Sequence, residues 1–354
     1  MSELIPPFDF QKVVIDTWTN GPFAIYGWGW RVLMGFLVIT ACGLVGNYLI
    51  LRRMALIGDA ISHSVLAGIA IAFLLTHSLG TLPMMLGALA AGLVTVGLIE
   101  FIHRKSRVKQ DAAIGIAFTS LFALGVILIH TQMKGTHFDA NCVLYGDLMA
   151  VGQSLVSVEL SPLLAGKLKA TGFTGETVLQ GNELFIAPSQ VLRMAVVAFV
   201  VIVLIRLFYK ELLVSSFDSA LAVSLGINAT AIHLGIMSAL SIVVVSSFDA
   251  VGAILVIAML ILPGATAHLL TQRLPVILWL TVAYALLSSV LGVHLARWID
   301  CNIAAAMVVA GAALFVLAWI FSPIDGPIAK WRARNASVDQ DLDGMGESAE
   351  PLVS

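Results

Sequence analysis

Two residues near the start of an apolar stretch have side chains of the types that bind metal ions in proteins. Asp59 and His63 are four positions apart in the sequence. On a helix, residues with this spacing lie on the same face, one turn from each other. A carboxylate and an imidazole on one face supply two ligands for a divalent transition-metal ion. A neutral histidine hydrogen-bonded to an aspartate inside a helix bundle has the same spacing, so both interpretations stay open at this point.

Two ligands are too few for Mn²⁺, Zn²⁺ or Fe²⁺, which take about four to six. A second copy of the same helix across a two-fold axis would supply two more, so ligand counting predicts a dimeric pore. Ala67 and Ala70 continue the face of His63, and small residues there allow another helix to approach closely. Counted from Arg53 at about 1.5 Å per residue, His63 lies roughly 15 Å along the helix, near the middle of a membrane.

The elements around this pair must lie in a membrane. Of the 354 residues, 59% are hydrophobic and 11% are charged, whereas soluble domains have about 45–50% apolar and about 25% charged residues. The formal net charge of −2 argues against a nucleic-acid partner. A membrane-crossing helix needs roughly 20 apolar residues, and the stretches of that kind are 31–51, 56–77, 82–102, 112–131, 190–209, 229–247, 251–270, 275–296 and 302–321.

These stretches predict an all-α polytopic membrane protein with eight or nine transmembrane helices. Eight stays open because only Ser246-Ser247-Phe248-Asp249 separates the sixth stretch from the seventh. A cluster of basic residues follows the third stretch, at 104–109, and such clusters mark cytoplasmic loops. The N-terminus is therefore expected outside and the C-terminus inside.

The same pattern divides the chain into parts. Residues 1–30 are expected to be external or interfacial, and residues 31–321 to form the transmembrane domain. Within that domain, 153–189 is an external insertion rich in Gly, Ser, Thr, Lys and Glu. The remaining residues, 322–354, are expected to be a cytoplasmic tail that is acidic and largely disordered.

Three further features carry weaker signals. Pro263 and Gly264 in the seventh stretch predict a broken or kinked helix, which is either a gate hinge or a static bend. Residues 210–228, on the cytoplasmic side, predict a short amphipathic helix that ends at Gly226. Several external residues form either a funnel for incoming cations or ordinary surface groups: His77, His130, His137 and His294, with Asp139 and Asp300.

Several motifs, taken in order, resemble the membrane permeases of bacterial ABC importers for manganese, zinc and iron. They are the run from Arg53 to Ser64, Leu144-Tyr145-Gly146-Asp147-Leu148, Lys210-Glu211-Leu212-Leu213 with Ser216-Phe217-Asp218 and Leu225-Gly226-Ile227, and the run from Val251 to Ala267. The resemblance covers most of residues 31–321. It implies a permease bundle of the type II ABC-importer kind, in the cytoplasmic (inner) membrane of a bacterium.

The resemblance also implies roles and partners. Asp59 and His63 would line the cation pathway, and the helix that docks on an ATPase would include Phe217, Asp218, Leu225 and Gly226. An extracytoplasmic metal-binding protein and a second permease copy, identical or related, are expected as partners. The metal is cargo, and no permanently bound cofactor is expected. The chain has no G-x-x-x-x-G-K-[ST] loop to hold ATP phosphates, so we expect a transport subunit that relies on separate ATPase subunits, not an enzyme.

Two other classes of function compete with this interpretation. A proton-coupled carrier would also use a buried carboxylate, and it would transport cations without ATP. An intramembrane metalloenzyme would also use an Asp/His pair, but the sequence has no H-E-x-x-H motif. Asp and His serve Mn²⁺, Zn²⁺ and Fe²⁺ alike, so the residues do not choose among the three metals.

Overall fold

The computed structural model describes residues 7, 9–19, 27–78, 80–132, 146, 148–151, 155–159, 179–180, 183–322 and 326–327. The acidic tail beyond residue 327 and the centre of the insertion, residues 160–178, lie outside these residues. The expectation of a disordered tail therefore stays a prediction.

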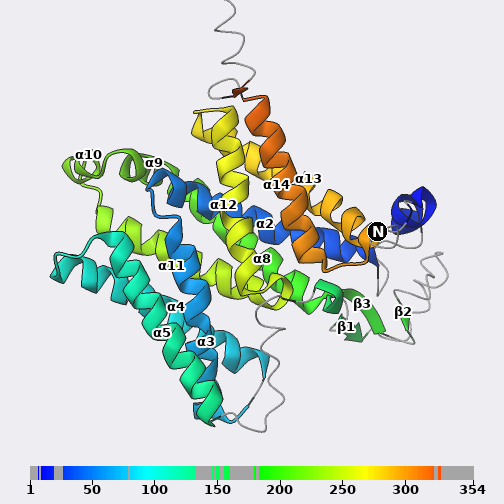
Figure 1. Cartoon of the computed structure of the whole chain (residues 1–354), viewed down its shortest axis with the longest axis horizontal. Helices are drawn as coiled ribbons and strands as arrows, with labels where there is room; N and C mark the ends of the chain where they lie inside the picture. Colours follow the sequence, from blue (N-terminus) through cyan, green and yellow to red (C-terminus); the bar gives the residue numbers. More distant parts are fainter. Residues whose placement is uncertain are drawn as a thin grey trace, which may run out of the picture.

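Within the described residues, nine helices are long and apolar enough to cross a membrane (Figure 1). They are α2 (Trp28–Leu51), α3 (Leu56–Thr76), α4 (Thr81–Lys105), α5 (Gln110–Gln132), α8 (Ser189–Leu207), α11 (Ala229–Val251), α12 (Ala253–Leu270), α13 (Leu274–Ile299) and α14 (Ile303–Ile320). At about 1.5 Å per residue, such helices match the roughly 30 Å hydrocarbon core of a bilayer. The predicted all-α membrane fold is confirmed, with nine spans in the part of the chain that the structure describes.

The break between the sixth and seventh spans lies at Gly252, so placing it at Ser246 to Asp249 was wrong. Helix α11 continues through both serines to Val251. The Ser247 hydroxyl donates a hydrogen bond to the Val243 carbonyl at 2.7 Å, and such a bond satisfies a serine without ending the helix. Gly252 has a φ of 78° and a ψ of 165°, a backbone conformation that is essentially restricted to glycine.

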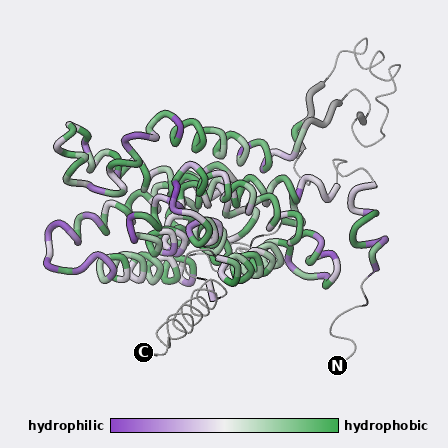
Figure 2. Tube along the Cα trace, turned by 90° about the horizontal axis from the view of Figure 1, so that it is seen from above, coloured by the Kyte–Doolittle hydropathy of each residue, from purple (hydrophilic) through white to green (hydrophobic). Residues whose placement is uncertain are grey.

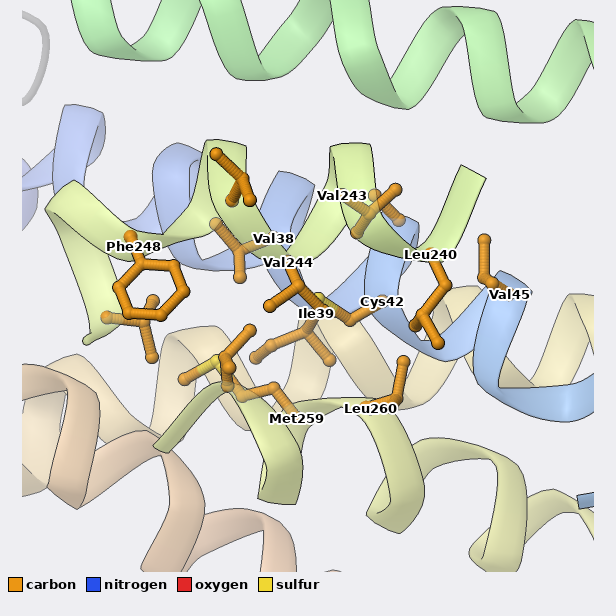
Figure 3. Close-up of a cluster of buried hydrophobic side chains, with 14 of the residues drawn as sticks. Val38, Ile39, Cys42, Val45, Leu240, Val243, Val244, Phe248, Met259 and Leu260 are labelled. Carbon is orange, nitrogen blue, oxygen red and sulfur yellow. The ribbon is translucent and has the colours of Figure 1, made fainter. Parts of the chain in front are cut away.

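Helix α2 runs through the centre of the bundle. It contacts α8, α11, α12 and α13, and most of its residues are buried. Figure 3 shows Ile39 and Cys42 of α2 between Val244 of α11 and Met259 of α12, in one continuous apolar core. The helices α3, α4 and α5 form a second group that packs mainly on itself. In Figure 2 hydrophobic colour follows the helices and hydrophilic colour gathers near their ends, as a membrane domain requires.

Small residues bring the helices of the second group into backbone contact. A methyl group placed on Gly68 of α3 would overlap the carbonyl of Gly87 of α4, and the reverse is also true. A methyl group on Gly125 of α5 would lie 2.7 Å from the amide nitrogen of Ala67. Close approach at small residues is a main source of helix association in membranes, where apolar side chains gain little by leaving lipid. The predicted close approach at Ala67 is confirmed, and the approaching helix is α5.

Hydrogen bonds sort the loops between the spans into two ends of the bundle. At the end that we call the basic end, the Nη2 atom of Arg104 donates to the Thr230 hydroxyl at 3.4 Å, and this bond joins α4 to α11. At the same end, the Ser322 hydroxyl donates to the Leu269 carbonyl. At the opposite end, the Asn302 side chain donates to the Gly146 carbonyl. This grouping agrees with the alternation that the sequence predicts. The cytoplasmic assignment of the basic end still rests on its Lys and Arg residues.

Two small elements lie outside the helix bundle. The insertion contains a three-stranded antiparallel sheet in the order β1-β3-β2, formed by β1 (Leu155–Glu159), β2 (Leu179–Gln180) and β3 (Glu183–Pro188). The sequence analysis assigned this insertion no structure. Near the N-terminus, a π-helical turn (Gln11–Ile15) continues into α1 (Asp16–Thr19) and contacts α13. The membrane domain itself remains helical.

Candidate metal-ion site and coupling segment

Asp59 and His63 form a pair on α3. The Nε2 atom of His63 lies 3.2 Å from the Oδ1 atom of Asp59. The side chain of His63 is 28% exposed and that of Asp59 is 34% exposed. The pair therefore lies at the surface of this chain, although it is part of a membrane-crossing helix.

The separation of these two atoms suits a shared metal ion as well as a hydrogen bond. Two ligand atoms that are each about 2.1 Å from one ion, at an angle between about 90° and about 109°, lie about 3.0–3.4 Å apart. The observed 3.2 Å falls in this interval. The same helical turn that brings the two side chains together thus gives them the spacing of two ligands of one ion.

Helix α5 holds the imidazole ring of His63 in place. The ring stacks on Phe118 with a centroid distance of 5.7 Å and meets the edge of Phe122 at 5.6 Å. One turn further along α3, Ala67 packs against Gly125 of α5. A ring fixed by two aromatic neighbours loses less conformational freedom when it binds an ion. Sequence reasoning missed both phenylalanines because their contacts join residues far apart in the chain.

The pair lies nearer the basic end than the sequence suggested. Helix α3 begins at Leu56, while Arg53 has a left-handed φ of 58° and belongs to the turn between α2 and α3. His63 follows Leu56 by seven residues, which places it about 10 Å along the helix. The distance of roughly 15 Å counted from Arg53 was too long, because it treated the turn as helix.

Within the described residues, Asp59 and His63 are joined by no third metal ligand. Among the residues that the structure describes, no group of three or more His, Cys, Asp or Glu side chains is placed to hold a metal ion. A transition-metal ion takes about four to six ligands, so an ion bound to Asp59 and His63 would need further ligands beyond those that the described residues place here.

Among the described residues, the histidines predicted to form a cation funnel belong to no group of three or more metal-binding side chains. His130 is exposed near the end of α5, and His137 lies outside the described residues. His294 packs against the N-terminal segment, where the Trp18 indole donates to its Nε2 atom at 3.3 Å. Its Nδ1 atom lies 2.7 Å from the Val290 carbonyl. Both ring nitrogens of His294 thus have partners, and the funnel stays a prediction.

Pro263 and Gly264 lie where α12 crosses α2. Helix α12 continues through Pro263, so the proline does not break it. A methyl group on Gly264 would lie 2.7 Å from the Cδ1 atom of Ile50 and 3.0 Å from the Oδ1 atom of Asn47. A side chain at position 264 would have to displace the ends of the Ile50 and Asn47 side chains, so Gly264 favours close packing at this crossing. The predicted role of these residues as a gate hinge stays a prediction.

The segment between α8 and α11 contains two short helices, where the sequence predicted one. These helices are α9 (Tyr209–Phe217) and α10 (Ser219–Ser224). Asp218 separates them and caps α10, because its Oδ1 atom accepts hydrogen bonds from the backbone N–H groups of Ala220 and Leu221 at 2.9 and 3.0 Å. A capping aspartate inside the segment was the signal for two helices that the sequence analysis overlooked.

Gly226 ends α10 as predicted. It has a φ of 80°, and the N–H of Ile227 donates to the Ala222 carbonyl at 2.9 Å while the N–H of Gly226 donates to the Val223 carbonyl at 3.0 Å. These two bonds form a Schellman motif, in which glycine takes the left-handed position without strain.

An apolar surface covers the outside of this segment. We call it the coupling surface; each of its large side chains is at least half exposed, and they are Phe217, Leu221, Val223 and Leu225. This surface lies in a connection between two spans, not within a span. Exposed apolar clusters of this kind are typical of surfaces that bind a partner protein or the membrane interface.

Arg52 connects this segment to α3, which carries Asp59 and His63, the candidate metal-binding pair that we call the metal pair. Its Nη2 atom donates to the Ser215 hydroxyl at 2.7 Å and its Nε atom donates to the Ser216 hydroxyl at 3.2 Å. Both serines belong to α9, and Arg52 lies four residues before the start of α3. Nothing near Arg52 in the sequence points to these serines, so the contact was not predicted.

Two motifs that carry the resemblance meet at the opposite end of the bundle. Gly146, from the Leu144–Leu148 motif, lies against the backbone of Val251 and Gly252, where α11 ends. A methyl group on Gly146 would lie 2.7 Å from the Val251 nitrogen. Gly146 thus allows the backbone at the end of α11 to approach closely, where any side chain would collide with it.

Comparison with known proteins identifies the family. The model of the ABC 3 transport family matches residues 29–164 and 163–322. The chain belongs to this family. Its relatives include the manganese transport system membrane protein MntD of Bacillus subtilis, which is 41% identical over 85% of this chain and 94% of that protein. The zinc transport system membrane protein TroD of Treponema pallidum is 37% identical over 88% of this chain and 78% of that protein.

A third relative and one solved structure complete the comparison. A probable iron transport system membrane protein of Haemophilus influenzae is 31% identical over 82% of this chain and 88% of that protein. The structure of PsaBC from Streptococcus pneumoniae in complex with Fab superimposes with a TM-score of 0.69 at 27% identity, covering 92% of this chain and all of that one. The chain is therefore a multi-pass membrane permease of the metal-type ABC transporters, a transport subunit and not a catalyst.

Proposed function

We propose that two copies of this permease, or one copy and a close relative, form the pathway of an ATP-driven importer of Mn²⁺, Zn²⁺ or Fe²⁺. The observation that carries the proposal is the pair of Asp59 and His63, 3.2 Å apart and partly exposed on a membrane-crossing helix. An ionisable pair in a membrane span costs free energy, so its presence there points to a function. The metal is cargo, and no cofactor is bound permanently.

Two observations support the proposed dimer: the number of metal ligands that one chain offers and the exposure of their side chains. Each chain offers two ligands on a face that its own helices leave about one third open. A two-fold axis beside α3 would bring a second Asp/His pair to the same ion and give it four protein ligands. Two carboxylates would then compensate the charge of a divalent ion as it loses water. Sites that are partly open to water also release their ions readily, as transport requires.

An ATPase subunit is the proposed partner at the coupling surface. Phe217 and Leu225 lie in a water-facing connection at the basic end, where an apolar cluster needs a partner. The chain has no phosphate-binding loop of its own. Arg52 offers a physical connection from this surface to the turn before α3. On the other side of the bacterial inner membrane, an extracytoplasmic binding protein would deliver the metal ion.

Reconstitution in vesicles tests this proposal. The full-length permease, incorporated in liposomes together with its ATPase and supplied with the binding protein on the opposite side, should accumulate radioactive Mn²⁺, Zn²⁺ or Fe²⁺ only when ATP is supplied on the side of the basic end. Vesicles that contain the permease alone, with an imposed pH gradient, form the control for a proton-coupled carrier. Uptake driven by the pH gradient without ATPase would refute the ABC mechanism. A lack of uptake in both arms would refute the proposal that this permease transports these metal ions.

A further inference from the structure

A cluster of charged and polar side chains joins α4 to α11 at the basic end. Glu100 of α4 accepts a hydrogen bond from the Nε atom of Arg104, one turn further along the same helix. The second carboxylate oxygen of Glu100, Oε2, lies 3.4 Å from the Nε2 atom of His233 of α11. The Nη2 atom of Arg104 donates to the Thr230 hydroxyl of α11 at 3.4 Å. Two residues of α4 thus contact two residues of α11, and we call these four residues the basic-end cluster.

The basic-end cluster is poorly suited to bind a metal cation. Glu100 lies in the membrane-crossing part of α4, where a carboxylate costs free energy and therefore points to a function. Arg104 already binds this carboxylate, and the positive charge of Arg52 of α2 also acts on His233. Two guanidinium groups near one carboxylate leave an excess of positive charge, which repels a divalent cation. Holding two helices together is the role that these contacts support better.

Water can replace the contacts of the cluster. The side chains of His233, Glu100 and Arg104 are 19%, 23% and 54% exposed, and ion pairs that reach water contribute little to stability. The same two helices meet differently about 12 Å deeper along α4. There, a methyl group on Gly92 of α4 would overlap the Ser241 hydroxyl of α11, and both residues are buried. Helices α4 and α11 are therefore tightly packed inside the membrane and joined by replaceable bonds at the basic end.

The coupling segment, α9 with α10, leads directly into the α11 side of the cluster. Only residues 225–228 separate α10 from α11. The backbone turn at Gly226 fixes one end of this connection, and the cap formed by Asn228 fixes the other. Thr230 and His233 lie in the first two turns of α11. Because the connection is short and has a defined shape, a displacement of the coupling segment acts on the residues of α11 that contact α4.

We propose that the basic-end cluster is a latch between α4 and α11, which opens when the ATPase moves the coupling segment. In the closed latch, Glu100 holds the basic end of α11 against α4. When the coupling segment moves, water replaces the partners of Glu100 and the basic end of α11 separates from α4. The latch rests on the proposed ATP-driven function, and it identifies a contact within the permease that the ATPase has to break.

A removable covalent link tests whether the latch has to open. Arg104→Cys and Thr230→Cys are combined in a chain in which Cys142 and Cys301 are replaced by serine, while the buried Cys42 is kept. The complex with its ATPase is placed in liposomes, supplied with binding protein and metal ion, and treated with a short bis-methanethiosulfonate crosslinker. Crosslinking should abolish ATP-dependent metal uptake, and dithiothreitol, which removes the crosslinker, should restore it.

The loop between α4 and α5 offers a matched control. Lys105 and Lys109 are both exposed and lie at the same end of the bundle. A crosslink between Lys105→Cys and Lys109→Cys joins α4 to the start of α5 and leaves α11 free, so uptake should continue. Loss of uptake in both crosslinked pairs would overturn the latch, because the effect would not be specific to α11.

ATP hydrolysis gives a second measurement, which needs no crosslink. Glu100→Gln keeps the size of the side chain but removes the charge that holds Arg104 and His233. Hydrolysis in the absence of metal ion should rise about twofold to fivefold, as expected for the loss of partly exposed ion pairs. Asp111→Asn, at the exposed start of α5, controls for the loss of a carboxylate and should hydrolyse ATP like the wild type. Equal rates in these two variants would overturn the latch.

The wild-type complex separates failure of the latch from failure of the proposed function. Wild-type uptake that persists after crosslinking of positions 104 and 230 would overturn the latch alone. The same conclusion would follow if these two cysteines did not crosslink, because α4 and α11 would then not meet at this end. A wild-type complex that takes up no metal ion would refute the proposed function, and the latch with it.

Discussion

The region around Asp59 and His63 and the coupling segment, α9 with α10, differ in what holds them in place. Helix α3 is held on several sides: Gly68 contacts α4, Ala67 contacts α5, and Gly58 lies against Leu260 of α12. Helices α9 and α10 are short, and their outer side chains, such as Phe217, point away from the bundle. Their geometry comes from local devices, namely the Asp218 cap and the Gly226 turn.

The difference separates a part that several neighbouring helices of this chain hold in place from a part that leaves its apolar side chains exposed. A site that must hold two ligands at a fixed spacing benefits from a rigid, well-packed helix. A docking segment only has to keep its own shape and leave its apolar side chains accessible. Substitutions should therefore act on α3 through ion transport, and on α9 and α10 through partner binding.

The largest effect is expected at the metal pair. Asp59→Asn and His63→Ala should each lower metal uptake at least about tenfold, equivalent to about 1.4 kcal/mol in the barrier, because the ion loses a charge or a ligand while it sheds water. Uptake of radioactive manganese or zinc, normalised to folded complex in the membrane, is the measurement. Asp111→Asn, at the exposed start of α5, is the control for loss of a carboxylate. Wild-type flux in both variants would show that α3 does not line the metal pathway.

A smaller effect is expected at the coupling surface. Phe217→Ala should weaken ATPase binding by about 1 kcal/mol, or roughly fivefold, as for an exposed aromatic residue of an interface. Co-purification of the ATPase with tagged permease measures it. Phe199→Ala is the matched control, since Phe199 is 67% exposed on α8 and Phe217 is 65% exposed. Normal stoichiometry in Phe217→Ala would show that the ATPase docks elsewhere.

A third effect should fall between the two regions, at Arg52. Arg52→Gln removes a charge-assisted contact to Ser215 and Ser216, which at this partly exposed position is worth about 1 kcal/mol. Metal transported per ATP should fall several-fold, while the ATPase still binds and hydrolyses ATP. Arg53→Gln, an exposed neighbour in the same turn, is the control. An unchanged ratio of transport to hydrolysis in Arg52→Gln would mean that the two regions communicate by another route.

The smallest effect concerns the cap between α9 and α10. Asp218→Ala removes two backbone hydrogen bonds at the start of α10 and should cost about 1 kcal/mol of local helix stability, whereas asparagine keeps the cap. Hydrogen exchange of residues 219–225 measures the difference. If Asp218→Asn weakens ATPase binding as much as Asp218→Ala does, the carboxylate itself contacts the partner and its capping role is secondary.

Much of the fold was predictable because the membrane imposes simple rules. Long apolar stretches, basic loops and the spacing of Asp59 and His63 each follow from local sequence. Features that depend on contacts between distant segments were not predictable, such as the stacking of His63 on Phe118 or the bond from Arg52 to Ser215. Ser246 and Ser247 looked like a loop because their polarity is visible in the sequence, whereas their bonding within α11 is not.

The single residue that joins α11 to α12 limits how these two helices can move. Because neighbouring Cα atoms are about 3.8 Å apart, the last residue of α11 and the first of α12 remain tethered through Gly252, whatever state the transporter adopts. Sliding of one helix along the other is therefore excluded near this joint, and rotation about it is the motion that remains. Gly146 covers the joint on one side. A rotation that moves the basic ends of α11 and α12 apart would therefore leave the joint at Gly252 almost stationary.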